Sequence, residues 1–315
     1  MASLLSVENL QVQFQTKKGI NTAVDGVSFS VEKGRILGIV GESGCGKSVT
    51  SMSILQLLGS NARISGGSIK LDGKELIGLP EKEMCRIRGN DIAMIFQDPM
   101  TALNPTLTIG TQLMEPIMLH QNCGKKEAWT RAVDVLKRVG IAAPEKRMKE
   151  YPHQLSGGMR QRVMIAMAVS CEPRLLIADE PTTALDVTIQ AQILELMCEL
   201  REKMGTAIML ITHDMGVVAE TADDVLVLYA GKAVEYGSIE DIFERPKHPY
   251  TQGLLNSIPR LDEDVELLNT IEGTVPAPDA MPAGCRFAPR CPYGKDRCMK
   301  EKPGVYHAGN SLVSC

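Results

Sequence analysis

An α/β fold with a mostly parallel central sheet is predicted by three features of this 315-residue chain. Short apolar runs that are typical of buried strands alternate with segments of helical periodicity. A glycine-rich loop joins one of these runs to one of the helical segments, as in folds that bind phosphate groups at a strand–loop–helix junction. Two stretches with hairpin-like turns indicate an antiparallel β subdomain beside the parallel sheet.

The individual elements follow from where these patterns fall along the chain. Helices are predicted at 47–58, 126–139 and 189–204, where apolar residues recur at helical spacing. The segment from about 98 to 170 is predicted to form a helical subdomain. Strands are predicted at residues 35–40, 92–96, 175–178 and 207–212, and hairpins at 64–73 and 225–236.

The composition changes near residue 250. Residues 273–303 are rich in Pro, Gly, Arg and Cys and show little periodicity. We therefore expect a main domain over residues 1–250 and a small Cys-rich C-terminal domain over residues 251–315.

Charge and hydropathy exclude several classes of protein. The formal net charge is −4, so a basic surface that binds nucleic acid is not expected. No run approaches the roughly 18–20 apolar residues that a membrane helix needs. The first residues do not form a basic segment followed by an apolar one, so no secretory signal is expected. We expect a cytoplasmic chain that works at a membrane only through partner subunits.

The glycine-rich loop GESGCGKS at 41–48 fits the phosphate-loop pattern G-x(4)-G-K-[ST]. Glycines let successive backbone N–H groups turn toward one anion, and the helix N-terminus adds partial positive charge. Lys47 would reach the β- and γ-phosphates of ATP, and Ser48 would ligate Mg²⁺. Cys45 occupies a variable position of the pattern. A chance glycine-rich turn is the alternative. The residues expected at the nucleotide are Gly41, Ser43, Gly44, Cys45, Gly46, Lys47, Ser48 and Val49.

A second motif is the apolar run LLIA at 175–178, which ends in Asp179 and Glu180. A buried parallel strand delivers its last residues to the carboxyl edge of the sheet, where the phosphate loop also lies. Asp179 would hold Mg²⁺, and Glu180 would orient and deprotonate the attacking water. A strand that ends in a solvated acidic turn is the alternative.

The segment LSGGMRQR at 155–162 resembles the signature sequence of ABC-type nucleotide-binding domains. The resemblance runs from about residue 5 to 237 and includes six motifs in the family order. Besides the three motifs above, these are Gln97 in FQDPM, Asp186 in ALD and His213 in ITHD. The resemblance implies a P-loop ABC-type fold that binds ATP and Mg²⁺ between two subunits.

The resemblance also implies roles for the remaining motif residues. Ser156, Gly157 and Gly158 would face the γ-phosphate that the opposite subunit binds. His213 would contact the γ-phosphate and brace Glu180. Asp186 would couple the two composite sites, and Gln97 would sense Mg²⁺ and the attacking water. Phe14 would stack on adenine, and packing of its ring into the core is the alternative.

Further segments resemble the dipeptide/oligopeptide permease branch of this family. They are FQDPMTALNP at 96–105, HPYTQ at 248–252 and IEGTVP at 271–276. This likeness implies the ATP-hydrolysing subunit of an importer for di- or oligopeptides, or for nickel complexes. The implied partners are two transmembrane permease subunits, a second and different ATPase subunit, and an extracytoplasmic substrate-binding protein. The implied location is the cytoplasmic face of the membrane.

Four cysteines gather near the C-terminus as Cys285-x5-Cys291-x6-Cys298-x16-Cys315. In a reducing cytosol, clustered cysteines favour a metal site over disulfides. Zinc sites usually contain tight C-x(2-4)-C pairs, which are missing here, and wider spacings suit a 4Fe–4S cluster. The family resemblance also points to that cluster. Zinc and a metal-free tail are the alternatives, and Cys315 lies where chains fray.

Two other functions compete with the transport ATPase. A soluble ABC ATPase acting on nucleic acid or ribosomes usually carries two fused ATPase domains or long coiled-coil insertions, and residues 98–155 leave room for neither. A non-catalytic nucleotide-binding module would be expected to have lost Glu180 or His213, and both are present.

Overall fold

The structure is a computed structural model, and it describes residues 3–17, 19–183, 185–258, 270–277 and 280–315. The chain divides into two compact units. The first unit combines Met1–Ile77 with Leu210–Cys315, and the second consists of Gly78–Met209. Among the described residues, none of the helices is both long and apolar enough to span a bilayer.

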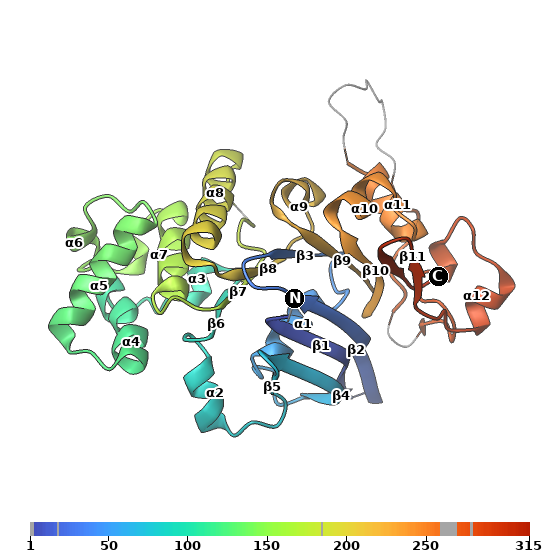
Figure 1. Cartoon of the computed structure of the whole chain (residues 1–315), viewed down its shortest axis with the longest axis horizontal. Coiled ribbons are helices and arrows are strands. Elements are labelled where there is room, and N and C mark those ends of the chain that lie inside the picture. The colour runs from blue at the N-terminus through green and yellow to red at the C-terminus, as the bar shows by residue number, and fades with distance from the viewer. Residues whose placement is uncertain (1–2, 18, 184, 259–269, 278–279) are drawn as a thin grey trace. The chain divides into compact units, whose positions relative to one another are not determined.

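An antiparallel sheet occupies the N-terminal part of the first unit (Figure 1). The predicted hairpin at 64–73 is confirmed, because its second strand pairs with the first across Asp72-Gly73. The two long strands that precede this hairpin were not predicted. Register shifts after Val7 and Leu10 break the two-residue alternation that would have revealed them. In the order β2-β1-β4-β5, the strands are Gly19–Val31, Leu5–Thr16, Ala62–Leu71 and Lys74–Glu75.

The other strands of the first unit form the order β11-β12-β10-β9-β3. Strand β3 pairs parallel to β9, whereas β9 and β10 form an antiparallel hairpin. The predicted hairpin at 225–236 is therefore confirmed, but its assignment to the antiparallel subdomain was wrong. Residues 225–228 of its first strand form a continuous, buried apolar run, which suits a strand that lies beside β3. The strands are β3 (Ile36–Val40), β9 (Asp224–Tyr229), β10 (Lys232–Ser238), β11 (Tyr306–Ala308) and β12 (Ser311–Val313).

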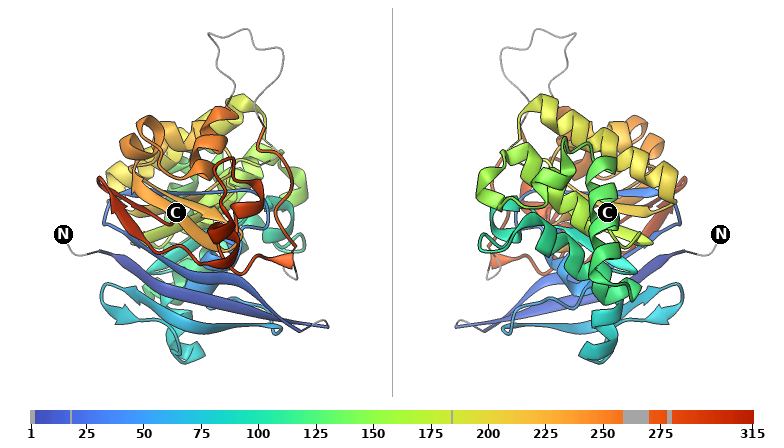
Figure 2. Two further views of the ribbon diagram at one scale, coloured as in Figure 1. Left: turned by 90° about the vertical axis from the view of Figure 1, so that its right-hand side faces the viewer. Right: turned by 90° about the vertical axis from the view of Figure 1, so that its left-hand side faces the viewer.

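The C-terminal residues extend this second sheet instead of standing apart from it. Strand β12 pairs with β10, and the amide of Ser314 donates to the carbonyl of Val234 at 2.9 Å. The left view of Figure 2 shows the red C-terminal strands beside the orange ones. The helices of this unit are α1 (Lys47–Ile54), α9 (Met215–Thr221), α10 (Ile239–Glu244), α11 (Pro249–Asn256), η3 (Ala288–Arg290) and α12 (Asp296–Lys300).

The second unit contains the segment predicted as a helical subdomain (Figure 1). Its strands β6 (Ile92–Ile95) and β7 (Leu175–Asp179) pair in parallel, as predicted. Strand β8 (Ala207–Ile211) crosses the boundary between the units. The helices are α2 (Glu81–Ile87), α3 (Pro99–Ala102), α4 (Ile109–Gln121), α5 (Lys125–Arg138), α6 (Pro144–Arg147), η1 (Pro152–Gln154), α7 (Gly157–Val169) and α8 (Val187–Met204).

Candidate functional site

The phosphate loop lies between β3 and α1, as the sequence predicts. Gly41 has φ +151°, and a Cβ there would lie 2.1 Å from the carbonyl oxygen of Leu228. Gly46 has φ +103°, and a Cβ there would lie 3.1 Å from the carbonyl oxygen of Ala23. Both positions therefore require glycine, because neighbouring backbone fills the space of a side chain and the left-handed φ disfavours one. The loop conformation is thus encoded by tight packing as well as by the motif.

Lys47 packs its side chain against the backbone of the phosphate loop. Its side chain is buried, and its ammonium donates to the carbonyl oxygens of Gly41 at 2.7 Å and Glu42 at 3.2 Å. Ser43 and Ser48 are exposed, Val49 is half-buried, and Gly44 has open space around its Cβ position. An anion in this loop would meet a preorganised cation and accessible amide and hydroxyl donors, which is the arrangement a nucleotide phosphate needs.

Cys45 lies beneath the same loop and is fully buried. Burial is the main reason that the pKa of its thiol is raised, so the thiol stays protonated. Its backbone carbonyl accepts a hydrogen bond from Gly231 N at 2.9 Å. The structure therefore gives the Cys45 side chain a packing position, while its backbone remains part of the loop.

The second motif brings Gln97 and Glu180 together in the second unit. Asp179 is buried at the end of β7, and Glu180 follows with φ +48°, a strained value for a residue with a side chain. Glu180 Oε2 accepts hydrogen bonds from Gln97 Nε2 and from Thr183 Oγ1, both at 2.9 Å. These two donors fix the orientation of the Glu180 carboxylate.

Thr183 was missed by sequence reasoning, and so was the buried Gln161. Gln161 Nε2 donates to the carbonyl oxygen of Pro181 at 2.6 Å and so connects α7 to the loop that follows Glu180. Threonine and glutamine are common at many kinds of position, so their residue type alone does not indicate a functional role. The proximity of Thr183 to Glu180 along the chain was the available signal.

The signature segment starts α7 in the second unit. Ser156 is the N-cap, and its hydroxyl accepts from Met159 N at 3.4 Å. Gly157 is exposed with open space at its Cβ position, whereas a Cβ on Gly158 would lie 3.2 Å from Ile189. These residues line a cavity of about 510 Å³. An exposed, capped helix start with two glycines offers backbone N–H groups to an anion.

Asp186 lies at the same cavity and has a clear structural role as the N-cap of α8. Its carboxylate accepts from Ile189 N at 3.0 Å. Coupling between two composite sites stays a prediction for this residue. His213 is exposed in the first unit, where the preceding Thr212 donates its amide to the carbonyl of Ile39 at 3.2 Å. Contacts of His213 with the γ-phosphate and Glu180 also stay predictions.

Phe14 lies on β1, opposite Asn21 and Ala62 on the neighbouring strands. The ring is half-buried and lines a hollow of about 340 Å³ together with Ile20 and Arg63. A flat aromatic face at such a hollow is compatible with base stacking, and stacking on adenine stays a prediction.

The four C-terminal cysteines line one cavity of about 310 Å³ in the first unit. The Cys285 amide donates to the Cys298 carbonyl at 2.7 Å, and β12 holds the chain just before Cys315. Cys315 is thus less prone to fray than its terminal position suggests. Burial is the main cause that raises the thiol pKa of Cys285 and of Cys315. Within the described residues, however, no group of three or more His, Cys, Asp or Glu side chains is already arranged to hold a metal ion.

A buried histidine sits beside this cavity. His248 is 1% exposed, and its Nδ1 accepts from Tyr250 N at 3.0 Å, which caps α11. The buried carboxylate of Glu235 accepts from His248 N at 2.9 Å. Desolvation lowers the pKa of His248 to about 4. The imidazole is therefore neutral at physiological pH.

This depressed pKa predicts a stability loss in mild acid. Between the unfolded pKa near 6.5 and the folded pKa of about 4, the unfolded chain binds a proton that the folded chain excludes, so stability falls as pH falls through this window. A His248→Asn variant keeps a capping acceptor but cannot titrate. From pH 7 to pH 5, the wild-type free energy of unfolding should fall by about 2 kcal/mol more than that of the variant. Urea unfolding followed by circular dichroism measures this, and parallel pH profiles would contradict it.

Two family models match this sequence. The ABC transporter model matches residues 24–183, and the model described as oligopeptide/dipeptide transporter, C-terminal region, matches residues 234–298. The chain is 56% identical over 317 residues to the oligopeptide transport ATP-binding protein AppD of Bacillus subtilis (strain 168), with 100% of this chain and 97% of the relative covered. It is 53% identical to the oligopeptide transport ATP-binding protein OppD of Escherichia coli (strain K12), with 99% and 93% covered.

A solved structure shows the same fold. It is the dimeric, post-hydrolysis state of the ATP-binding cassette MJ0796 bound to ADP and Pi, at a TM-score of 0.67 and 27% sequence identity, covering 75% of this chain and 98% of that one. This chain therefore combines the phosphate loop, the Gln97–Glu180 pair and the capped signature helix with a match to its relatives over nearly its whole length. This chain belongs to the ABC transporter family, in the branch of oligopeptide/dipeptide transport ATP-binding proteins.

Proposed function

We propose that this chain is the ATP-hydrolysing subunit of an importer of di- or oligopeptides. The observation that carries the proposal is the intact catalytic set, in which Lys47 lies folded into the phosphate loop and Glu180 is oriented by Gln97 and Thr183. A chain that merely bound nucleotide would not need an oriented carboxylate. The peptide cargo rests on the names of relatives that match this chain over its full length.

The proposed mechanism uses two equivalent half-sites, one on this chain and one on a second, different ATPase subunit. Lys47 and the loop amides bind the phosphates, and Ser156 with Gly157 and Gly158 covers the γ-phosphate that the opposite subunit binds. Glu180 then accepts a proton from the attacking water. Closure and reopening of the two subunits would be passed to the membrane subunits through the segment that begins at Gln97.

Mg²⁺ has a suitable donor set in this chain. The candidate ligands are the Ser48 hydroxyl at the start of α1, the Asp179 carboxylate at the end of β7 and the Gln97 amide oxygen, and oxygen donors are what Mg²⁺ prefers. When bound, the ion would neutralise charge on the β- and γ-phosphates.

The proposed assembly contains two transmembrane permease subunits, a second ATPase subunit and an extracytoplasmic substrate-binding protein. Residues 1–250 would form the ATPase domain and residues 251–315 the C-terminal domain, and the chain would lie at the cytoplasmic face of the membrane. The test is uptake of a labelled tripeptide into proteoliposomes that contain the whole complex. ATP-dependent uptake supports the proposal, whereas ATP hydrolysis stimulated by RNA or ribosomes and not by peptide would favour the soluble alternative.

We also propose that Cys285, Cys291, Cys298 and Cys315 bind a 4Fe–4S cluster. The support is chemical: four thiols line one cavity in a region where few apolar residues are available to build a core. The thiols are not already arranged as a metal site, so binding would require them to turn inward. The cluster would staple the C-terminal segment.

The cluster proposal predicts about four irons and four acid-labile sulfides per chain purified without oxygen, with a broad visible absorbance. Cys291→Ser should abolish the absorbance, because a thiolate ligand is lost. Cys85→Ser is the matched control, since Cys85 is exposed on α2 and remote from this cavity along the chain. Zinc alone, or no metal in the wild-type chain, would overturn the cluster and leave the ATPase proposal intact.

A further inference from the structure

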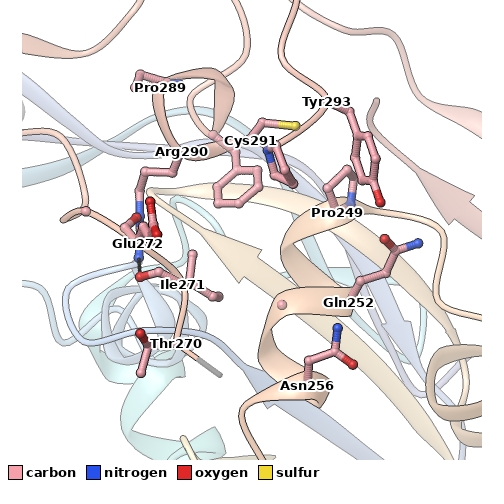
Figure 3. A pocket seen from close by; sticks show the side chains of 14 residues that line it. Pro249, Gln252, Asn256, Thr270, Ile271, Glu272, Pro289, Arg290, Cys291 and Tyr293 are labelled. Atoms are coloured by element: carbon pink, nitrogen blue, oxygen red, sulfur yellow. Dashed lines mark hydrogen bonds between the residues drawn. The ribbon is translucent and has the colours of Figure 1, made fainter. Parts of the chain in front are cut away.

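The C-terminal domain reaches the phosphate loop through Arg290. Its guanidinium donates through Nη1 to both carboxylate oxygens of Glu42, at 2.8 and 3.1 Å. Nε and Nη2 donate to the backbone carbonyls of Glu272 and Ile271 at 2.9 and 3.1 Å, and Figure 3 shows these groups around Arg290. The Arg290 side chain is only 6% exposed and that of Glu42 is 29% exposed, so salt screens this ion pair less than it screens a fully exposed pair.

Glu42 is the residue after Gly41 in the phosphate loop, and it is held at three places. Arg290 holds its carboxylate, and its backbone amide donates to the Tyr250 hydroxyl at 3.0 Å. Its backbone carbonyl accepts from the ammonium of Lys47 at 3.2 Å. Two of the three holding groups come from the C-terminal part of the chain, and the third is the lysine of the motif itself.

The same C-terminal segment also supports the middle of the loop. Arg286 donates to the backbone carbonyl of Ala230 and, at 3.0 Å, to the carboxylate of Asp25. The adjacent Gly231 donates its amide to the carbonyl of Cys45 in the phosphate loop at 2.9 Å. Arg286 therefore fixes the β9–β10 turn on which the middle of the loop rests.

The segment between Arg286 and Arg290 is packed into the core by the ring of Phe287. Phe287 is 2% exposed and makes edge contacts with Tyr229 and Tyr250, with ring centroids 5.1 and 5.4 Å apart. Edge-to-face packing of this kind fixes ring positions. Tyr250 is thus held by the ring of Phe287 while its hydroxyl holds Glu42 N. The three side chains Arg286, Phe287 and Arg290 act from one short stretch of chain.

We infer that residues 286–290 form a brace that keeps the phosphate loop in its nucleotide-binding shape, with Arg290 as a positioning residue for ATP. This inference rests on the proposed role of Gly41–Ser48 in ATP binding. Arg290 acts through Glu42: without the guanidinium, the half-buried carboxylate would be left unpaired beside the incoming phosphates and would repel them. The C-terminal domain then contributes to ATP binding by positioning the phosphate loop.

The test is titration of the full-length chain with fluorescent mant-ATP and Mg²⁺. Arg290→Gln should raise the dissociation constant roughly tenfold, as expected for loss of a charge-assisted hydrogen bond near the ligand. Arg290→Lys should restore part of the affinity, because it returns the charge. Arg138→Gln is the matched control, since it breaks an exposed arginine–glutamate pair with Glu172 and should leave binding unchanged.

A double-mutant cycle separates positioning from a general loss of structure. If Arg290 acts through Glu42, the double variant Glu42→Gln, Arg290→Gln should bind mant-ATP better than Arg290→Gln alone, because no unpaired carboxylate remains. Should Arg290→Gln fail to fold, Arg286→Gln tests the brace at its second arginine, because it loses the hydrogen bonds to the Ala230 carbonyl and the Asp25 carboxylate. Wild-type affinity for mant-ATP in that variant would overturn the brace.

Lys47→Ala distinguishes this inference from the proposed function. Loss of binding in Lys47→Ala together with wild-type affinity in Arg290→Gln would overturn the brace and leave the nucleotide site standing. Wild-type affinity in Lys47→Ala would overturn the assignment of the phosphate loop itself.

Discussion

Replacing Glu180 with Gln is expected to lower ATP hydrolysis in the assembled transporter by about 10²–10⁴-fold, the usual contribution of a positioned general base. The amide cannot accept the proton of the attacking water, yet it matches the carboxylate in size. Gln97 and Thr183 donate to Glu180 Oε2, and both could still bond to an amide oxygen. ATP should therefore bind normally and trap a closed dimer. Phosphate release and size-exclusion chromatography with ATP measure the two effects.

A matched control for this variant exists in the second unit. Glu172 also has positive φ, at +55° beside +48° for Glu180, but it is exposed and pairs with Arg138. Glu172→Gln should leave hydrolysis unchanged. Normal turnover by the Glu180→Gln variant in the complete transporter would show that another group activates the water.

Replacing Lys47 with Ala is expected to weaken ATP binding by a factor on the order of 10² or more, as found when one partner of a buried charge pair is removed. Lys47 is 6% exposed and its ammonium is held by the carbonyls of Gly41 and Glu42, so it is already positioned before phosphate arrives. Removing it leaves those carbonyls facing the phosphates without a cation between them. Equilibrium titration with mant-ATP measures the change.

Lys203→Ala is the control for Lys47→Ala. Lys203 lies at the end of α8, where its side chain is 72% exposed and pairs with Glu199 at 2.6 Å. A surface pair of this kind contributes little to stability, so the variant should bind ATP like the wild type. Equal losses in both variants would point to a general effect of removing positive charge and not to the phosphate loop.

The main fold could be predicted because its signals are local. Strands β3, β6, β7 and β8 are short apolar runs, and the helices α5 and α8 have regular apolar spacing. Each of these elements can therefore be recognised from its own residues. The long strands β1 and β2 were missed because bulges interrupt their alternation. Pairing across the antiparallel sheet depends on partners that the local pattern does not identify.

The candidate site was predictable to the extent that its chemistry is fixed by short motifs. Glycines at positive φ in the phosphate loop and the N-caps Ser156 and Asp186 work through their own neighbouring backbone. Their residue types and spacing therefore reveal them. The four cysteines were recognisable as a set for the same reason, although only the structure places them around one cavity.

The sequence by itself determined the α/β fold class, the phosphate loop, the pair Asp179–Glu180 and the family of this protein. Only the tertiary structure decided that Gln97 and Thr183 orient Glu180, that Cys45 is buried, and that Arg290 holds Glu42 across a separation of 248 positions in the chain. The physical reason is the range of the interactions. A short motif works through interactions with its own neighbouring backbone, so its residue types and spacing reveal it. An ion pair between distant segments depends on how strands and aromatic side chains pack, and no periodic pattern in the sequence reports that packing.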